Sequence, residues 1–293
     1  MIRVVHATDI HWFVPPRLRQ LASKRLIGSV NLYLRGRRHH FDDRVQDALV
    51  RSMLDAAADV VLISGDLTAQ AIHREFELAL AKLSPLLARP ALVQAGNHDV
   101  YTQGSSTHDR IAQHFGPWLH RRPDGLARLD LPGLTILGLD PNRPHPLASG
   151  RVPEAQLAAL PAALADTRPD DAVILSLHYP ILDRHGRLYD GWTHGLENAS
   201  ALVEVLRRSA RKPTLIVHGH QHHGYRVALD LGDVQVPIVD PGSGGYAYEP
   251  ERDRAACFCV YTFEGPRLVE VERHRHTERG FAPEPGGAFA TGR

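Results

Sequence analysis

Short apolar runs that end in polar residues recur along the first two thirds of the chain. Residues 2–8, 59–64 and 91–95 are such runs, and each is typical of a buried strand. Asp42-Asp43 begins a helical pattern, since acids suit the first turn of a helix, and a further helix is predicted over 72–87. Because strand, polar loop and helix alternate, the pattern predicts a mostly parallel sheet with helices packed on it. The same patterns predict further strands at 126–131, 134–139, 172–177 and 214–217, and helices at 109–115, 154–165 and 197–208.

At Gly224 the pattern changes to alternating apolar and polar positions without helices. The predicted strands here are expected to form an antiparallel group that closes a second sheet; they cover 225–231, 234–239, 257–263 and 268–271. Residues 276–293 are rich in Gly, Pro and charge and are predicted to be a disordered tail. No repeat or domain boundary is visible, so residues 1–275 are expected to form one α/β domain.

Residues 14–41 form a basic insertion directly behind the first strand. They hold seven Lys and Arg residues, no acid, and apolar residues at helical spacing. Such a helix could lie on anionic lipid. The alternatives are a solvated flap over the active site and a nucleic-acid-binding patch.

Composition adds few constraints. The net charge of +1 over 293 residues gives no overall field that would attract nucleic acid or a membrane. Cys257 and Cys259 would share one strand face, which predicts two buried free thiols and a reducing compartment. No secretion signal or long apolar run is visible, so we expect a cytoplasmic protein, with peripheral membrane association through 14–41 as the alternative.

Five polar clusters follow predicted strands. Because the carboxyl ends of strands in such folds converge on one crevice, we expect the clusters to form one site. They are Asp9-Ile10-His11, Gly65-Asp66, Gly96-Asn97-His98-Asp99, His178 and Gly219-His220-Gln221-His222. Oxygen and imidazole donors without thiolate suit Mn, Fe or Zn, and seven such donors suffice for two ions. Two divalent cations outweigh two carboxylates, so the site should attract an anion, and metal pairs of this kind serve displacement at phosphorus.

These motifs, in this order, resemble the calcineurin-like metallophosphoesterase superfamily, over about residues 2–275. The resemblance implies a four-layer αββα sandwich of two mixed sheets flanked by helices, with a dinuclear centre at the strand ends. It implies that Asp66 bridges the metals and that a metal-bridging hydroxide is the nucleophile. His98 would assist by stabilising the transition state or protonating the leaving oxygen, oriented by Asp99. The implied ligands of the first metal are Asp9, His11, Asp66 and His222, and those of the second are Asp66, Asn97, His178 and His220.

The motifs are similar to those of cyclic-nucleotide phosphodiesterase-like members, which favours a small nucleotide-type phosphodiester as substrate. The alternative is a lipid-linked pyrophosphate such as UDP-2,3-diacylglucosamine, which the basic insertion would suit, although the best-known enzymes of that branch carry Arg where this chain has His98. Asn142, Arg143 and His194 could contact substrate, but a turn at the end of a strand explains the first two equally well. A nuclease is disfavoured because no basic groove with interleaved aromatic residues is visible. A non-catalytic scaffold is disfavoured because no metal ligand of the family is missing.

Overall fold

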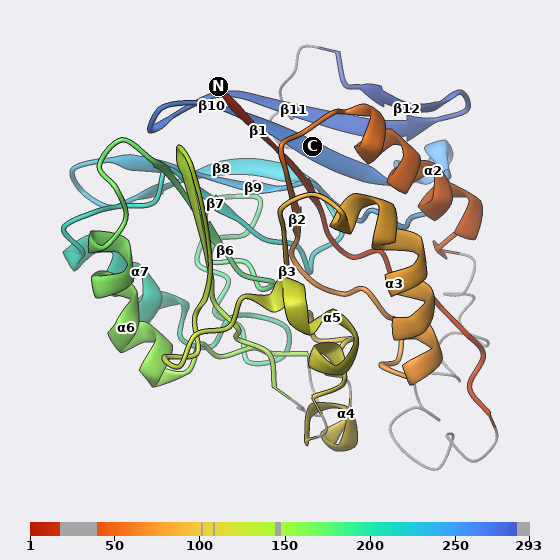
Figure 1. The fold of residues 1–293 in the computed structure, drawn as a ribbon, viewed down its shortest axis with the longest axis horizontal. Helices are drawn as coiled ribbons and strands as arrows, with labels where there is room; N and C mark the ends of the chain where they lie inside the picture. Colours follow the sequence, from red (N-terminus) through yellow and green to blue (C-terminus); the bar gives the residue numbers. More distant parts are fainter. Residues whose placement is uncertain (18–39, 101, 108, 144–147, 286–293) are drawn as a thin grey trace.

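The predicted strands and one additional strand assemble into two mixed six-stranded sheets (Figure 1). The computed structural model describes residues 1–17, 40–100, 102–107, 109–143 and 148–285. In the first sheet the order is β12-β11-β10-β1-β2-β3, and in the second it is β4-β5-β6-β7-β9-β8. The strands of the first sheet are β1 (Ile2–Ala7), β2 (Val60–Ile63), β3 (Ala91–Val93), β10 (Cys257–Glu264), β11 (Arg267–Thr277) and β12 (Gly280–Pro283). Those of the second are β4 (Ala127–Leu131), β5 (Leu134–Gly138), β6 (Ala172–Ser176), β7 (Leu215–Val217), β8 (Tyr225–Asp230) and β9 (Gln235–Asp240).

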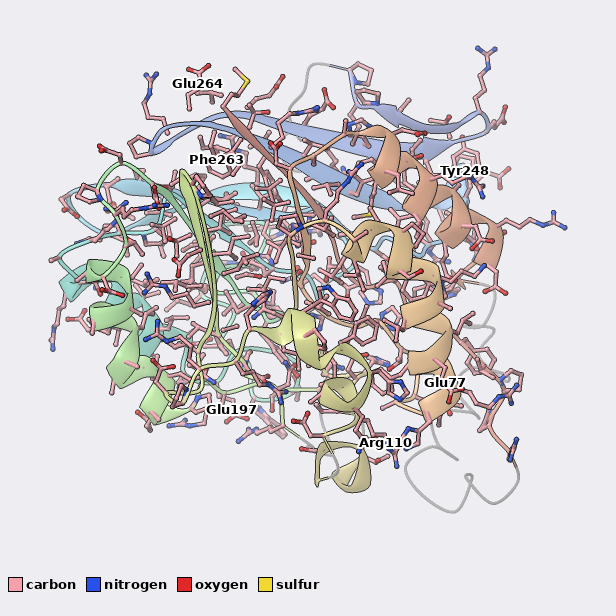
Figure 2. All side chains as sticks on the ribbon, viewed as in Figure 1. Glu77, Arg110, Glu197, Tyr248, Phe263 and Glu264 are labelled. Atoms are coloured by element: carbon pink, nitrogen blue, oxygen red, sulfur yellow. The ribbon has the colours of Figure 1, made fainter. Side chains whose placement is uncertain are left out.

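Helices cover the outer faces of both sheets and produce four layers (Figure 1). Side chains of α2, α3 and α5 share a core with the first sheet, those of α6 and α7 share one with the second, and a third core lies between the sheets. Phe263 of β10 is part of that middle core (Figure 2). The predicted αββα sandwich is therefore confirmed. The helices are α2 (Asp43–Asp55), α3 (His73–Leu87), α4 (Gln103–Thr107), α5 (Arg110–Leu119), α6 (Glu154–Ala165) and α7 (Ala199–Arg208), with a short 3-10 turn, η3, at Pro250–Arg252.

The antiparallel group predicted after Gly224 is divided between the two sheets. β8 and β9 extend the second sheet, with β9 parallel to β7, whereas β10 joins the first sheet antiparallel to β1. The prediction of one group was wrong because β10 is apolar on both faces. Its Phe258 packs into the core under the helices, while its Tyr261 packs between the sheets. Cys257 and Cys259 are buried free thiols in this strand, as predicted.

The predicted disordered tail is ordered at its beginning. β11 runs to Thr277, and β12 pairs with it antiparallel. Phe281 anchors this hairpin, because its ring lies 5.4 Å from the ring of Phe258 and packs against the core under the helices. The composition of this segment favoured disorder, because composition does not show that one aromatic residue, Phe281, packs against the core. Residues 286–293 lie outside the described residues.

Most of the basic insertion predicted over 14–41, namely residues 18–39, also lies outside the described residues, so its helix stays a prediction. Among the helices that the structure describes, none has the length and apolar character needed to span a membrane.

Gln94 links the two sheets directly beneath the polar clusters. It follows β3, and its buried Nε2 donates to the carbonyl oxygens of Leu139 at 3.0 Å and Ser176 at 3.3 Å in the second sheet. Gln94→Met keeps the volume but removes the side-chain donor to Leu139 O and the acceptor of the buried Ser176 hydroxyl, so we expect the free energy of unfolding to fall by about 2 kcal/mol. Urea denaturation would measure this loss. Gln235→Met, at the exposed start of β9, is the matched control and should change little; equal stabilities for the two variants would contradict this role of Gln94.

Candidate metal centre

Most of the predicted metal ligands sit on backbone that L-residues rarely adopt. Their φ angles are positive although they are not glycines, a conformation that costs free energy and is concentrated at functional sites. This group comprises Asp9 (φ 52°), His11 (56°), Asp66 (53°), His220 (75°) and His222 (61°). All lie in loops after β1, β2 and β7, at the carboxyl ends of the strands. The loops are therefore bent so that these side chains point to a common place.

Two glycines permit the close approach of these loops. A Cβ on Gly96 would lie 2.1 Å from Oδ1 of Asp66, and a Cβ on Gly219 would lie 2.1 Å from Oγ1 of Thr8 and 2.4 Å from Oδ2 of Asp9. All three distances are far below van der Waals contact. Glycine is thus required at these positions by the carboxylates that pass beside them.

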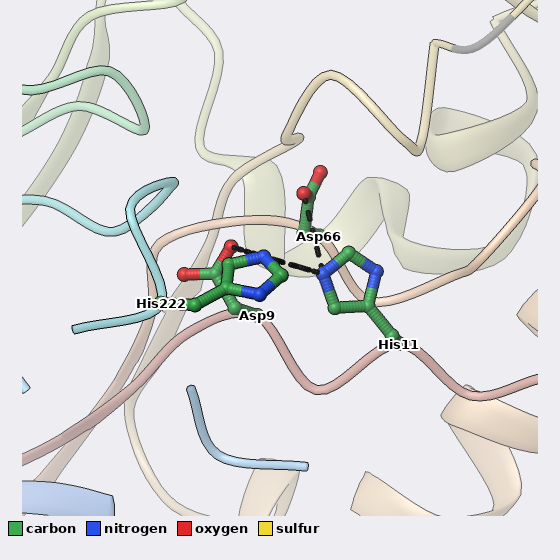
Figure 3. A group of neighbouring side chains, drawn as sticks. All are labelled: Asp9, His11, Asp66 and His222. Atoms are coloured by element: carbon green, nitrogen blue, oxygen red, sulfur yellow. Dashed lines mark hydrogen bonds and ion pairs between the residues drawn. The ribbon is translucent and has the colours of Figure 1, made fainter. Parts of the chain in front are cut away.

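Asp9, His11, Asp66 and His222 form the first group of side chains (Figure 3). One potential ligand atom from each lies within 4.8 Å of all the others. His222 Nε2 lies 3.2 Å from Asp9 Oδ1 and 3.1 Å from His11 Nε2. His11 Nε2 in turn lies 3.6 Å from Asp66 Oδ2. We call this set the first subsite.

Asp66, Asn97, His178 and His220 form a second group, which we call the second subsite. His178 Nε2 lies 3.5 Å from Asp66 Oδ2 and 3.2 Å from Asn97 Oδ1. Asn97 Oδ1 also lies 2.8 Å from His220 Nδ1. A single oxygen, Asp66 Oδ2, therefore faces imidazoles of both subsites, as the predicted bridging role requires.

One oxygen of each carboxylate accepts a hydrogen bond from a backbone amide, and the other oxygen faces the imidazoles. Asp9 Oδ2 accepts a hydrogen bond from the amide of His220 at 2.9 Å, and Asp66 Oδ1 accepts one from the amide of His98 at 2.7 Å. Two imidazoles are held in a comparable way. His178 Nδ1 lies 2.9 Å from the carbonyl of Ser64 and His220 Nε2 lies 2.8 Å from that of His194. Since a carbonyl can only accept, these nitrogens carry a proton, and the other nitrogen of each ring is an electron-pair donor when the ring is neutral.

Burial and neighbouring charges set the protonation states of the site. Burial lowers the pKa of His11 and of His220 to about 3, which keeps both rings neutral. Burial opposes the ionisation of Asp66, but His178 and His98 outweigh it and hold the carboxyl pKa well below its usual range. Burial likewise disfavours a charged His178, yet Asp66 outweighs it and raises the imidazole pKa to about 9. The carboxylates are therefore ionised and His11 and His220 are neutral, which is the donor state that a divalent cation binds, whereas a cation has to displace the proton that Asp66 stabilises on His178. The group fits a dinuclear metal site.

His98 lies beside the first subsite, but its partner is not the predicted one. Its ring is edge-on to that of His11 with centroids 4.7 Å apart, and its Nδ1 donates to the carbonyl of Ala69 at 2.8 Å. Asp99 was predicted to orient His98. Its carboxylate instead accepts from the amides of Gly96 at 2.9 Å and Thr68 at 2.9 Å, because the tight turn folds it back onto the backbone. Asp99 therefore fixes the loop that carries Asn97 and His98.

Two of the three predicted substrate contacts, Asn142 and Arg143, make interactions within the protein. The side-chain amide of Asn142 donates to Ala95 O at 2.7 Å and to Asp140 at 2.8 Å, which corresponds to the strand-end turn. Arg143 pairs with Glu197. The carbonyl of His194 accepts from His220, while its side chain is exposed. The structure thus supports the alternative interpretation of Asn142 and gives Arg143 an internal carboxylate partner.

Sequence reasoning missed the loop after β9. Ser243 Oγ donates to the carbonyl of Asp9 at 2.7 Å, and Tyr246 OH lies 3.0 Å from His222 Nδ1. Phe41 packs on the same side of the site, with its ring centroid 4.6 Å from that of His11. The signal was present, because residues 242–246 read Gly-Ser-Gly-Gly-Tyr directly after an apolar strand, in the same position as the five recognised clusters.

Gly219→Ala should displace Asp9, since the new Cβ would overlap its carboxylate. We expect the divalent-metal affinity to fall about 10- to 100-fold, the range found when support of a metal ligand is lost. Isothermal titration with Mn²⁺ would measure it. Gly116→Ala, in α5 with no atom within 4 Å of the added Cβ, is the control. If both alanine variants bind metal like the wild type, the close approach at Gly219 has no role in placing Asp9.

Comparisons with known proteins agree with this geometry. The sequence model of the family described as calcineurin-like phosphoesterase matches residues 2–224. A protein of Rhodopseudomonas palustris named as a probable cyclic nucleotide phosphodiesterase is 32% identical over 231 residues, which cover 70% of this chain and 79% of that protein.

Two solved structures share the fold. A dimetal phosphatase from Danio rerio has a TM-score of 0.57 at 14% identity and covers 96% of both chains. The purple acid phosphatase PPD1 from yellow lupin, Lupinus luteus, has a TM-score of 0.61 at 14% identity, covering 96% of this chain and 52% of its own. The predicted resemblance is confirmed by the match over residues 2–224 and by the relative at 32% identity: the chain belongs to the calcineurin-like phosphoesterase family and is a metal-dependent hydrolase of phosphoric esters.

Proposed function

We propose that the chain is a dinuclear phosphodiesterase that hydrolyses small nucleotide-type phosphodiesters. The observation that carries the dinuclear assignment is the position of Asp66 Oδ2, 3.6 Å from His11 Nε2 and 3.5 Å from His178 Nε2. One carboxylate oxygen that faces both subsites is what a pair of neighbouring cations needs as a bridge. The ligands of the two ions are the seven residues of the first and second subsites, with Asp66 common to both.

Two bound divalent ions, of Mn, Fe or Zn type, supply Lewis acidity toward the phosphoryl oxygens and make water a competent nucleophile near neutral pH. The chain contributes the arrangement of donors. Only two carboxylates, Asp9 and Asp66, stand among the seven ligands, so the loaded site keeps a positive charge that attracts a phosphodiester monoanion. Four of the seven ligands are buried and the other three are half-buried, and such preorganised ligands need little reorganisation when the charge on phosphorus changes.

His98 is the proposed acid. Its Nδ1 is engaged by the carbonyl of Ala69, so the proton that it exchanges with a substrate is carried at Nε2. The ring lies beside His11, at the edge of the first subsite. From there a proton at Nε2 can pass to the departing ester oxygen or stabilise its charge.

The substrate class rests on the relative from Rhodopseudomonas palustris, which carries the name of a cyclic nucleotide phosphodiesterase. No specific observation favours the lipid-linked alternative, because most of the insertion that suggested it lies outside the described residues. A parallel assay of cAMP, bis(p-nitrophenyl) phosphate and UDP-2,3-diacylglucosamine tests the proposal. We expect Mn²⁺-dependent hydrolysis of the first two. Cleavage of the pyrophosphate alone would overturn the substrate class, and no cleavage of any phosphoester under metal-replete conditions would overturn the catalytic proposal.

A further inference from the structure

The supports of the imidazoles differ between the two subsites. In the second subsite, the outer nitrogens of His178 and His220 meet the backbone carbonyls of Ser64 and His194. In the first subsite, His222 Nδ1 meets a side chain, the hydroxyl of Tyr246, at 3.0 Å. A side-chain support can be removed by substitution, whereas a backbone carbonyl cannot.

We infer that Tyr246 is a positioning residue that sets the metal affinity of the first subsite selectively, through the orientation of the His222 imidazole. This inference rests on the proposed dinuclear function. With Nδ1 held by the phenol oxygen, His222 presents Nε2 to Asp9 Oδ1 at 3.2 Å and to His11 Nε2 at 3.1 Å. Supports of this kind fix which nitrogen faces a cation and make the ring a better donor.

Tyr246 is itself held from several sides. The guanidinium carbon of Arg254 lies 5.2 Å from the centroid of its ring, and the ring of Phe41 lies 5.5 Å away on an antiparallel bridge between Phe41 and Tyr246. The glycines before Tyr246 contact the loop of the first motif, since Gly244 N donates to Thr8 O, directly before that motif, at 2.8 Å. A Cβ on Gly245 would lie 2.0 Å from the carbonyl oxygen of Ile10. The phenol is therefore a preorganised part of the wall of the first subsite.

The loop that carries Tyr246 also places the end of the basic insertion beside the metal ligands. Residues 40–42 are held by hydrogen bonds from Ala247 N to His40 O at 2.8 Å and from Asp42 N to Gly245 O at 3.3 Å. Phe41 then packs its ring 4.6 Å from that of His11. Both imidazoles of the first subsite thus contact one aromatic pair, Phe41 and Tyr246. In the second subsite the ring of Tyr179 lies 5.6 Å from that of His178 and 4.4 Å from that of His220, and the outer nitrogens of both imidazoles meet backbone carbonyls.

The test compares Tyr246→Phe with the wild type by isothermal titration of the metal-free full-length protein with Mn²⁺. For a site with two binding steps, we expect one dissociation constant to rise about 10- to 100-fold and the other to change less than about threefold. Tyr248→Phe is the control, since the Tyr248 ring packs edge-on against His276, 5.8 Å away.

Two unchanged dissociation constants would overturn the inference. Equal rises in both constants, accompanied by a lower thermal midpoint of the metal-free variant, would overturn it as well, because they assign Tyr246 to general packing. Failure of the proposed function is distinguishable from these outcomes: it would appear in the wild type, as binding of less than one Mn²⁺ per chain, before any variant is compared.

Discussion

Asp66→Asn is expected to abolish phosphodiester hydrolysis, with kcat/KM falling about 1,000-fold or more, which corresponds to about 4 kcal/mol of transition-state stabilisation. The structure explains why the loss should be large. The carboxylate uses Oδ1 to accept from His98 N and Oδ2 to face His11 and His178. An amide has a single acceptor oxygen, so it can keep one of these functions but not both. The variant also loses the negative charge that two neighbouring cations need between them.

Metal content separates this explanation from a folding defect. We expect the variant to bind about one divalent ion per chain or fewer, whereas the wild type binds two. Asp171→Asn is a matched control, because this buried aspartate precedes β6 at the end of the strand opposite to His178 and pairs with Arg168. The control should keep its metals and its activity. Activity of Asp66→Asn within about tenfold of the wild type would refute the bridging role.

The parts of the site that could be predicted are those set by topology. Polar residues after a strand of an α/β sheet converge with those after its neighbours, so Asp9, Asp66 and His178 could be brought together from their positions alone. The supporting contacts could not be predicted in this way. The partners of Asp99 depend on how one tight turn folds back, and Tyr246 reaches His222 only because the loop after β9 crosses the first motif.

The same is true of the fold: features set by neighbouring residues could be predicted, whereas contacts between residues far apart in the chain could not. The alternation of apolar and polar residues identified β8, β9, β10 and β11 as strands, because this two-residue pattern can be seen in neighbouring positions of the sequence. It did not reveal that β10 pairs with β1, since that pairing joins residues about 250 positions apart in the chain, such as Val5 and Val260. β12 was missed because its short Gly-Phe-Ala-Pro segment has no period to detect, and it is held by Phe281 against the core.

His98→Asn should lower kcat about 100- to 10,000-fold for a cyclic nucleotide while leaving two metals bound. Asparagine can still donate a hydrogen bond toward the carbonyl of Ala69, as Nδ1 does at 2.8 Å, but it has no titratable nitrogen. Single-turnover and steady-state assays, together with metal analysis of the same samples, would measure both quantities. His73→Ala, on the exposed first turn of α3, is the control for loss of an imidazole and should leave kcat unchanged.

The leaving group then distinguishes the two roles open to His98. A ribose alkoxide is a strong base that needs a proton as the ester bond breaks, whereas p-nitrophenolate leaves without one. If His98 is the acid, the loss in His98→Asn should be large for cAMP and at most about tenfold for bis(p-nitrophenyl) phosphate, because only the first reaction requires proton transfer. Equal losses for both substrates would instead assign the imidazole to stabilising charge on the phosphoryl group, and unchanged rates for both would remove His98 from the catalytic machinery.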